Sequence, residues 1–356
     1  MNSLLINGGE FMLRSEKVVR EDALDAIEYY FQKGWTDGLP VVPPTKEKIY
    51  EMLASVNMDP ETIIGSIPER GRVFTAELVA INAVMAGCLP GYFPVVMAAA
   101  QAISEPDFGL HGPSASTHGA AIMIIVNGPI TQQIGMNHGA NAFGPGNRAN
   151  ATIGRAIRLL LINSGGSPEF DRSTLGTPAK YSFCFAEKET EWTQLHVQRG
   201  YQKLDSTVTV FACEGPNQIQ NHSALKGENI LKTLAERMSP LGSFNIASET
   251  EMAVTLCPEH YHHLQSEGWA KEDVQEFLYK HAVKTVKEMK LGGILEDPIT
   301  SNDENIVKHA IPSPDHILLT VAGGEAGRFS ACMPGWFSYK QSKAVTLPIQ
   351  AATGFT

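Results

Sequence analysis

The chain has 356 residues, of which 43% are hydrophobic and 19% are charged, and its formal net charge is −10. This composition excludes a disordered or fibrous protein, and an acidic chain without clustered Lys and Arg excludes nucleic acid as a partner. No apolar run reaches the roughly 20 residues of a membrane helix, and the first residues lack the pattern of a secretory signal. We therefore expect a cytoplasmic protein with no membrane partner.

Apolar residues at helical spacing define the predicted helices. The first covers residues 21–31 and ends before Gly34. Thr45 and Thr75 have the position of N-cap residues for helices over 46–56 and 76–87. Further helices are predicted over residues 93–103, 150–163, 224–238, 259–267 and 271–289, of which the last is long.

Four β-rich apolar runs define the predicted strands. They cover residues 122–126, 208–212, 252–256 and 317–321, and each is followed at once by a loop rich in Gly, Pro and polar residues. Continuous apolar strands indicate a sheet covered on both faces, and ligands bind to such sheets beyond the carboxyl ends of the strands. We therefore predict an α/β fold with mixed or mostly parallel sheets covered by helices.

The length of the chain favours two lobes. We expect an N-terminal extension over residues 1–20, a first α/β lobe over 21–165 that carries the site loops, a second α/β lobe over 166–345, and a C-terminal tail over 346–356. Extended proline-rich segments such as residues 39–44 often pack across subunits, so we also expect a homo-oligomer.

The segment from residue 109 to residue 150 has the composition of a small-molecule site. It contains His111, His118 and His138, and its one charged residue is Arg148. Glycine lets a ligand approach the backbone closely, and Asn and His donate hydrogen bonds without a fixed charge. The candidate substrate-binding residues of this segment are His111, Asn137, Asn141, Asn147 and Arg148.

Arg148 stands where a Gly-Pro-Gly-Asn-Arg loop opens into a predicted helix. Unpaired N–H groups at a helix start bind anions, and an arginine adds a bidentate contact to a carboxylate. We expect a small, anionic metabolite as the substrate. The alternative is an ordinary glycine-rich connection in which Arg148 pairs with a structural acid.

The histidines allow two kinds of chemistry. His118 and His138 are candidates for a general acid or base. A metal ion bound by His111, His118 and His138 is the alternative, although their spacing matches no compact zinc pattern and no Asp or Glu lies between them. Each histidine taken singly is also compatible with a satisfied buried position.

Acidic residues follow two of the predicted strands. Glu214 has the placement of a catalytic carboxylate. Asn217, in the same loop, and Glu325, in the loop after residues 317–321, are candidate substrate-binding residues. A capping or ion-paired role is the alternative for either glutamate. The glycines around Glu325 match no nucleotide-binding loop, so no nucleotide cofactor is expected, and no GxSxG elbow of a serine hydrolase occurs.

Five cysteines occur without a CxxC pair, which fits a reducing compartment. Cys213 directly follows the predicted strand over residues 208–212, and Cys332 comes shortly after the loop that contains Glu325. They are candidate nucleophiles only if a histidine or an amide dipole lowers the pKa of the thiol.

Two long strings carry a resemblance to a known family. Residues 34–45 read GWTDGLPVVPPT, and residues 141–155 read NAFGPGNRANATIGR. From about residue 30 to residue 340 the chain resembles a poorly characterised bacterial family associated with UGSC-type redox proteins, which bear a Cys- or selenocysteine-Gly-Ser-Cys motif. The chain has no such motif, so the resemblance implies a separate small redox (seleno)protein as partner. Asp37, in the first string, is a further candidate substrate-binding residue.

These observations lead to three functional hypotheses. The first is an enzyme that performs a thiol- or selenol-linked reduction, an elimination or a carbon–heteroatom bond cleavage on a small anionic metabolite, with His118, His138 or Glu214 moving protons. The second is a metal-dependent hydrolase or lyase that uses the three histidines. The third is a ligand-binding subunit of a redox complex without activity of its own.

Overall fold

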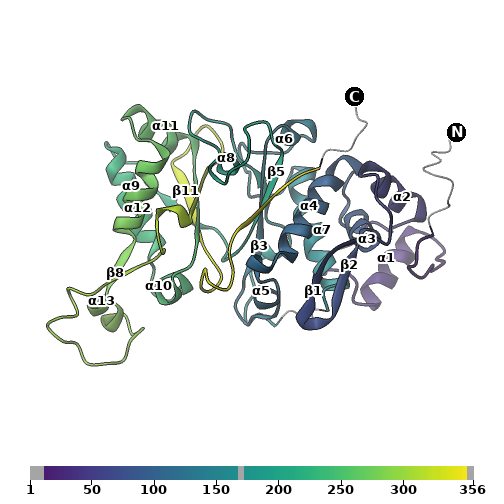
Figure 1. Cartoon of the computed structure of the whole chain (residues 1–356), viewed down its shortest axis with the longest axis horizontal. Coiled ribbons are helices and arrows are strands. Elements are labelled where there is room, and N and C mark those ends of the chain that lie inside the picture. The colour runs from purple at the N-terminus through teal and green to yellow at the C-terminus, as the bar shows by residue number, and fades with distance from the viewer. Residues whose placement is uncertain (1–11, 167–171, 351–356) are drawn as a thin grey trace.

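The computed structural model describes residues 12–166 and 172–350, which form a mixed α/β fold. Within these residues, two four-stranded sheets face each other across an apolar layer, and helices cover the outer face of each sheet. The layers therefore run helix, sheet, sheet, helix (Figure 1). The predicted α/β class with mixed sheets is confirmed.

The first sheet has the strand order β12-β5-β3-β4. Its strands are β3 (Ala121–Asn127), β4 (Cys184–Ala186), β5 (Thr207–Cys213) and β12 (Val345–Pro348). Strand β3 pairs antiparallel with β5 and parallel with β4, and β12 pairs antiparallel with β5. The start of β3 and the end of β5 therefore lie at the same edge, with Ala121 opposite Cys213.

The second sheet has the strand order β10-β7-β11-β6. Its strands are β6 (Asn217–Gln220), β7 (Met252–Leu256), β10 (Ile317–Val321) and β11 (Phe329–Pro334). Strands β7 and β10 are parallel, whereas β11 is antiparallel to both β7 and β6. An isolated antiparallel bridge between Cys213 and Gly335 joins the two sheets at one end.

Two small hairpins lie outside the main sheets. The first is β1 (Ile63–Ile67) with β2 (Arg72–Thr75), and the second is β8 (Val283–Thr285) with β9 (Val307–His309). The predicted long helix over residues 271–289 is wrong, because β8 interrupts it. Thr285 Oγ1 accepts the N–H of Glu288 (3.1 Å) and the Glu288 carboxylate accepts the N–H of Thr285 (2.7 Å). This capping box starts a new helix in place of continuing the first.

The helices on the side of the first sheet match the predicted periodicity, except that the two short helices over residues 111–115 and 130–133 are not predicted. They are α1 (Ala23–Gln32), α2 (Lys46–Ser55), α3 (Ala76–Ala86), α4 (Phe93–Ser104), α5 (His111–Ala115), α6 (Ile130–Gln133) and α7 (Arg148–Asn163). Thr45 Oγ1 and Thr75 Oγ1 accept the backbone N–H three residues ahead, at 3.4 Å and 3.3 Å, as N-caps do.

The remaining helices belong to the second half of the chain. They are α8 (Leu195–Gln198), α9 (Gly227–Met238), α10 (Phe244–Ser248), α11 (Pro258–Ser266), α12 (Lys271–His281) and α13 (Val286–Leu291). Helices α9, α11 and α12 cover the second sheet, and α13 stands apart from the main body (Figure 1). No helix of residues 12–166 and 172–350 is long and apolar enough to cross a membrane.

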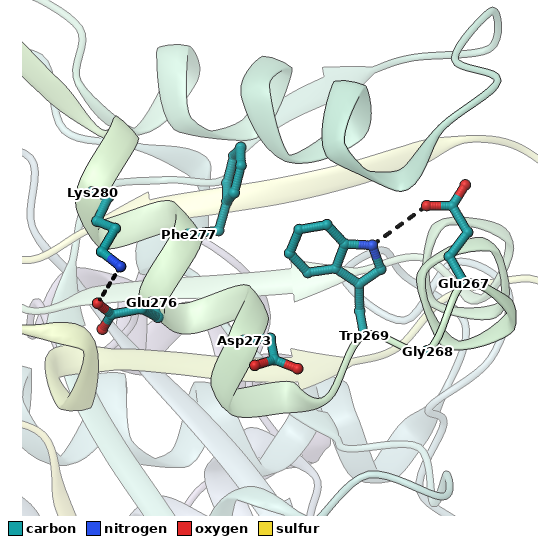
Figure 2. Close-up of a pocket in the computed structure, with 7 residues that line it drawn as sticks. All are labelled: Glu267, Gly268, Trp269, Asp273, Glu276, Phe277 and Lys280. Carbon is teal, nitrogen blue, oxygen red and sulfur yellow. Dashed lines mark hydrogen bonds and ion pairs between the residues drawn. The ribbon is translucent and has the colours of Figure 1, made fainter.

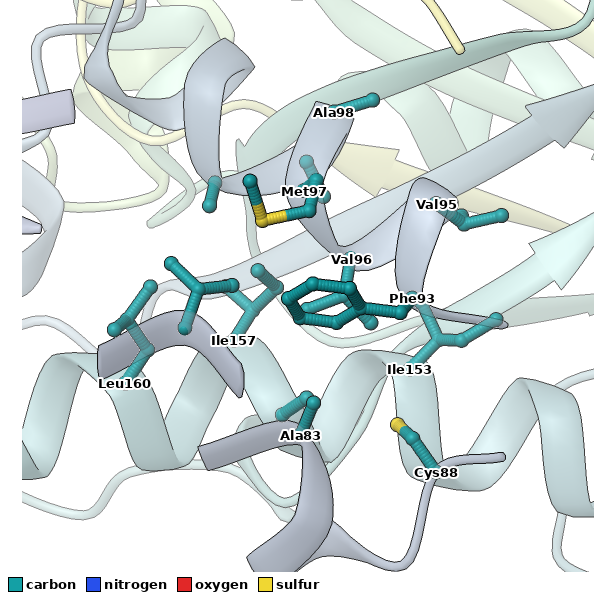
Figure 3. Packing of buried hydrophobic residues seen from close by; sticks show 14 of the residues in the cluster. Ala83, Cys88, Phe93, Val95, Val96, Met97, Ala98, Ile153, Ile157 and Leu160 are labelled. Atoms are coloured by element: carbon teal, nitrogen blue, oxygen red, sulfur yellow. The ribbon is translucent and has the colours of Figure 1, made fainter. Parts of the chain in front are cut away.

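Three apolar layers hold the fold together. Helices α4 and α7 pack on the outer face of the first sheet, where Phe93, Ile153 and Ile157 meet (Figure 3), and α3 packs against these two helices. The two sheets meet through alternate residues of their strands, such as Met123 and Phe211 of the first sheet. Side chains alternate between the faces of a strand, so one set of residues packs on helices and the other on the opposite sheet.

The proposed lobe borders stay predictions. Strand β3 of the first predicted lobe pairs along its whole length with β5 of the second. The predicted tail begins inside β12, and residues 351–356 lie outside the described part of the chain. Residues 1–11 of the predicted N-terminal extension also lie outside it.

Candidate functional site

Strand β3 separates the histidines of the segment 109–150. His111 begins α5 and His118 precedes β3, whereas His138 follows β3 at its far end. A strand of seven residues spans roughly 20 Å, so His118 and His138 cannot hold one metal ion or one small substrate. The segment contributes to two separate places in the molecule.

At the first place, His118 meets a carboxylate. His118 Nε2 lies 3.8 Å from Glu214 Oε1. Ser243 Oγ donates a hydrogen bond of 2.5 Å to the same oxygen. The Phe244 ring packs edge-on against the imidazole, with the ring centroids 4.9 Å apart. We call His118, Glu214, Ser243 and Phe244 the His118 cluster.

The fold brings the His118 cluster together from distant parts of the sequence. His118 lies in the loop before β3, and Glu214 directly follows β5, so the antiparallel pairing of the two strands places both residues at one edge. Ser243 is the N-cap residue of α10 and Phe244 its first helical residue. His118 and Glu214 are among the residues predicted from the sequence, whereas Ser243 and Phe244 are not, because no pattern in the sequence places α10 at this edge.

Burial sets the charge state of His118. It lowers the pKa of the imidazole below its usual value, the nearby Glu214 carboxylate raises it, and the Lys180 ammonium lowers it. The imidazole is therefore neutral at pH 7 and able to accept a proton. Its Nδ1 atom is buried and has no hydrogen-bond partner within the described residues. A ligand that donates to Nδ1 would remove the cost of this unpaired atom.

An aromatic wall, formed by Phe244, Trp336 and Phe337, continues from the cluster. The Phe337 ring lies 5.5 Å from Phe244 and 5.5 Å from Trp336, measured between ring centroids. Trp336 Nε1 donates to Ser116 Oγ (3.0 Å). A Cβ added to Gly112 would stand only 2.3 Å from the Trp336 ring. The glycine therefore lets α5 and the indole approach closely.

Lys180 lies near His118, and Arg70 contacts α5 through the His111 carbonyl and Ser114. Lys180 Nζ donates to Ser173 Oγ (2.5 Å), and Ser173 Oγ donates to the His118 carbonyl (2.9 Å). Arg70 lies close to Arg172, and burial together with that second positive charge lowers the Arg70 pKa. Side chains of one sign raise the local concentration of ligands of the other sign. Of these basic groups, the Lys180 ammonium is the one that lowers the pKa of His118.

A small cavity lies beside Lys180. It has a volume of about 30 Å³ and lies between α5, β3 and α7, with Ser114, Lys180 and Ser182 among its lining residues. Ser114 Oγ also accepts a hydrogen bond of 3.0 Å from Arg70 Nη2. The volume is enough for one or two water molecules.

No protein-family model, curated protein or solved structure matches the chain. The family resemblance therefore stays a prediction, and function is argued from the geometry of the site.

At the second place, His138 lies near a different ion pair. Lys188 Nζ and Glu325 Oε1 form a short ion pair. The Lys188 ammonium lowers the pKa of Glu325 most strongly, with smaller effects from His262 and His138. His138 Nδ1 is buried without a hydrogen-bond partner within the described residues. Glu325 is therefore the ion-pair partner of Lys188, which is the alternative to a substrate-binding role that the sequence leaves open.

Several predicted substrate-binding residues hold the loop before α7 instead. Asn147 Oδ1 accepts the Asn150 N–H (3.0 Å) as the N-cap of α7, and Asn141 Nδ2 donates to the Pro145 carbonyl (2.7 Å). Asn137 Oδ1 accepts the Gly139 N–H (2.9 Å). Their polar groups satisfy the backbone of a tightly turned loop.

Arg148 and Asp37 also have structural contacts. Arg148 Nε donates to the Gly87 carbonyl (3.0 Å), which lies at the C-terminal end of α3. Asp37 accepts two hydrogen bonds of 2.8 Å from Arg155 on α7. The string of residues 34–45 is thereby fixed to α7. Arg148 does not reach the His118 cluster, since it belongs to the far end of β3.

His111 and Asn217 lie nearer the His118 cluster. His111 is exposed at the start of α5, and its carbonyl accepts a hydrogen bond of 3.4 Å from Arg70. Asn217 begins β6, three residues after Glu214, and its Oδ1 accepts from Arg237 Nη2 (3.3 Å).

Metal and thiol chemistry find little support in the described residues. No group of three His, Cys, Asp or Glu side chains in residues 12–166 and 172–350 has the arrangement of a metal site. Cys213 and Cys332 are fully buried, and burial raises the pKa of both thiols, that of Cys332 to about 12. Neither has the lowered pKa that a nucleophilic cysteine requires.

A wider groove of about 380 Å³ lies away from the His118 cluster, beside α12 (Figure 2). Its lining residues are Glu267, Gly268, Trp269, Asp273, Glu276, Phe277 and Lys280. Glu267 accepts a hydrogen bond from Trp269 Nε1 (3.4 Å), and Glu276 pairs with Lys280 (2.8 Å). The groove contains none of the predicted site residues, and these polar groups satisfy one another. We therefore place the candidate active site at the His118 cluster.

Proposed function

We propose that the protein is an enzyme that transfers a proton on a small anionic metabolite at the His118 cluster. His118 is the general base, and Glu214 holds the imidazole and stabilises the positive charge that it acquires. The observation that carries the proposal is the half-buried, neutral His118 with one nitrogen 3.8 Å from a carboxylate and the other without a partner.

The pair has the properties that proton transfer requires. A base works best when its pKa lies near the working pH and when a second group orients it. Ser243 donates to Glu214 Oε1 and keeps that oxygen facing His118. When His118 takes a proton, the Glu214 carboxylate becomes the partner of an imidazolium, as in catalytic histidine–carboxylate pairs on unrelated folds.

The surroundings favour a carboxylate substrate. The Lys180 ammonium is close enough to His118 to lower its pKa, and the aromatic wall gives the site an apolar side. A substrate whose carboxylate lies towards Lys180 presents the hydrogen on its neighbouring carbon to His118. Loss of that proton and of a heteroatom group on the next carbon is an elimination, which cleaves a carbon–heteroatom bond.

The family resemblance adds a partner to this proposal. Because the five cysteines of the chain are buried, any thiol or selenol step needs a second chain. The small redox protein that the resemblance implies would supply it.

Solvent exchange tests the proposal without a known product. The purified protein is incubated in D₂O with a panel of 2-hydroxy, 2-amino and 3-substituted carboxylates, and loss of the hydrogen next to the carboxylate is followed by proton NMR. We expect exchange with at least one compound and a 10²- to 10⁴-fold loss of its rate in His118→Asn, roughly the range for removal of a general base.

The matched control is His222→Asn, because His222 is exposed and packs on Phe329, outside the His118 cluster. It should keep the wild-type rate. Glu214→Gln should slow exchange and move the pH profile to lower pH, because Glu214 raises the pKa of His118. Full exchange in His118→Asn would refute the proposal, and binding without exchange across the panel would favour a ligand-binding subunit.

A further inference from the structure

A strap of ten residues, 335–344, joins the two sheets beside the His118 cluster. It leaves the second sheet after β11 and enters the first sheet at β12. The strap carries Trp336 and Phe337, two of the three residues of the aromatic wall. The position of the strap therefore decides the shape of that wall.

Glu251 binds the strap at both of its ends. The Glu251 carbonyl accepts the N–H of Gly335 (3.0 Å), and the Glu251 carboxylate accepts the N–H of Ala344 through a short hydrogen bond. Between these ends, the Tyr339 N–H donates to the Glu249 carbonyl (3.3 Å). One residue just before β7 thus closes a loop of ten residues onto the body of the protein.

The side chain of Glu251 is buried, with 7% of the residue exposed. Three charged groups act on the Glu251 carboxyl directly: Arg199 after α8, Lys343 of the strap, and Asp107 of the 3₁₀ turn Pro106–Phe108. Tyr201 and His316 lie near Arg199, and Asp315 lies beside His316 before β10. Arg199 also donates to the Ala344 carbonyl (2.7 Å). The carboxyl is therefore enclosed among charges of both signs.

Burial is the largest influence on this carboxyl and raises the pKa of Glu251 to about 7, against the lowering effects of the Ala344 N–H, Arg199 and Lys343. The folded protein then holds a proton that the unfolded chain releases near pH 4.5. Stability from this group is present at low pH and is lost as the pH rises through about 7. Above that pH a buried charge favours local opening to water.

We propose that Glu251 is a positioning residue, which holds the strap and its aromatic side chains against the His118 cluster while its carboxyl is neutral and releases them when it is charged. The consequence for catalysis rests on the proposed function of the cluster, whereas the movement of the strap does not. The chemistry of the switch is one proton lost to solvent, with no bond in the chain broken.

Hydrogen–deuterium exchange of the full chain measures the strap directly. Mass spectrometry follows peptides that cover residues 335–344 between pH 5.5 and pH 8.5, with the rates corrected for the intrinsic pH dependence of amide exchange. We expect the protection of the wild-type strap to fall by up to tenfold per pH unit as the pH rises towards 7, the slope for the release of one proton, and to level off above pH 7, where the carboxyl is charged in both the closed and the open strap. In Glu251→Gln the corrected rate should not change with pH.

The matched control is Glu249→Gln, two residues away, because the Glu249 side chain is exposed and only its carbonyl contacts the strap. It should keep the wild-type pH dependence. Burial lowers the pKa values of His118 and His316, so their titration lies to the acid side of the change expected for Glu251. Persistent pH dependence in Glu251→Gln would overturn the inference. If this variant does not fold, a wild-type strap with constant protection overturns it alone.

The two proposals fail separately. A strap that opens with pH in a protein whose solvent exchange survives His118→Asn would refute the function and keep the role of Glu251. A strap with constant protection, in a protein whose activity needs His118, would refute the role of Glu251 and keep the function. In the second case the aromatic wall is fixed by packing.

Discussion

At the scale of single residues, the thiols show how strongly burial controls reactivity. All five cysteines are buried, and burial raises the pKa of Cys88 and Cys332 to about 12 and those of Cys184 and Cys213 still further. A thiol attacks only as the thiolate, and access limits it as well. Cys213 is the buried last residue of β5, so its place next to Glu214 does not make it a nucleophile.

Thiol labelling tests this conclusion. At pH 8 we expect fewer than one of the five cysteines to react with an aromatic disulfide reagent in the native protein over an hour. All five should react within seconds in guanidinium chloride, where the unfolded chain exposes them at the ordinary pKa of about 8.5. The measured signal is the absorbance of the released thiolate. Fast native labelling that disappears in Cys213→Ser would show that this site opens and would restore a thiol mechanism.

The candidate site was partly predictable from the sequence. His118 and Glu214 were identified because each lies in a loop beside a long apolar strand, where exposed polar side chains collect. Arg148 was predicted to bind an anionic substrate, because the N–H groups at a helix start bind anions. In the structure its guanidinium donates a hydrogen bond to the Gly87 carbonyl. Ser243 could not be found, because only the tertiary fold places the start of α10 beside Glu214.

At the scale of elements, local signals were reliable where the chain carries them. Thr45 and Thr75 cap the helices that they were expected to cap. The four strands with continuous apolar runs lie within one or two residues of their predicted bounds. Strands β6 and β11 were missed, because β6 consists mostly of Asn and Gln and the short β11 contains a Ser and a Pro, so neither is a continuous β-rich apolar run.

The contact between α5 and the strap makes a prediction at this scale. In Gly112→Ala the added Cβ would stand 2.3 Å from the Trp336 ring, so the indole must move and its hydrogen bond to Ser116 breaks. Overpacking of this kind costs about 1–3 kcal/mol. We expect a loss of stability in that range in urea unfolding, together with a shift in the fluorescence of the native protein.

The control for this variant is Gly91→Ala. Gly91 lies in the 3₁₀ turn Pro90–Tyr92, and a Cβ there meets no atom within 4 Å. Its stability should stay within about 0.5 kcal/mol of the wild type. Equal effects of the two substitutions would mean that the close approach of α5 to Trp336 does not constrain the site.

At the scale of the whole molecule, the arrangement of the sheets was not predictable. A strand covered on both faces has the same apolar sequence whether its covers are two helices or a helix and a second sheet. The sequence therefore indicated covered sheets but not that one sheet covers the other through Met123, Phe211, Leu318 and Met333. The predicted border between the lobes at residue 165 falls between β3 and β5, which are paired neighbours in the first sheet.

Because both halves share the first sheet and the apolar layer between the sheets, we expect them to unfold together. Phe211 is 2% exposed in this layer, so Phe211→Ala should lower the free energy of unfolding by about 3–5 kcal/mol. Circular dichroism and tryptophan fluorescence should move to lower urea concentration by the same amount. Trp35 lies beside α1 and Trp269 beside α12, so fluorescence reports on both halves.

The matched substitution is Phe329→Ala, because Phe329 is 52% exposed at the start of β11. It should change stability by about 0.5 kcal/mol or less. Two resolved transitions, of which Phe211→Ala shifts one, would mean that the lobes fold independently and that the layer between the sheets behaves as a domain interface. A single transition that shifts as a whole would mean that neither half is stable without strands of the other. The reason is that β3 pairs with β4 and β5, and both of these strands lie within residues 184–213.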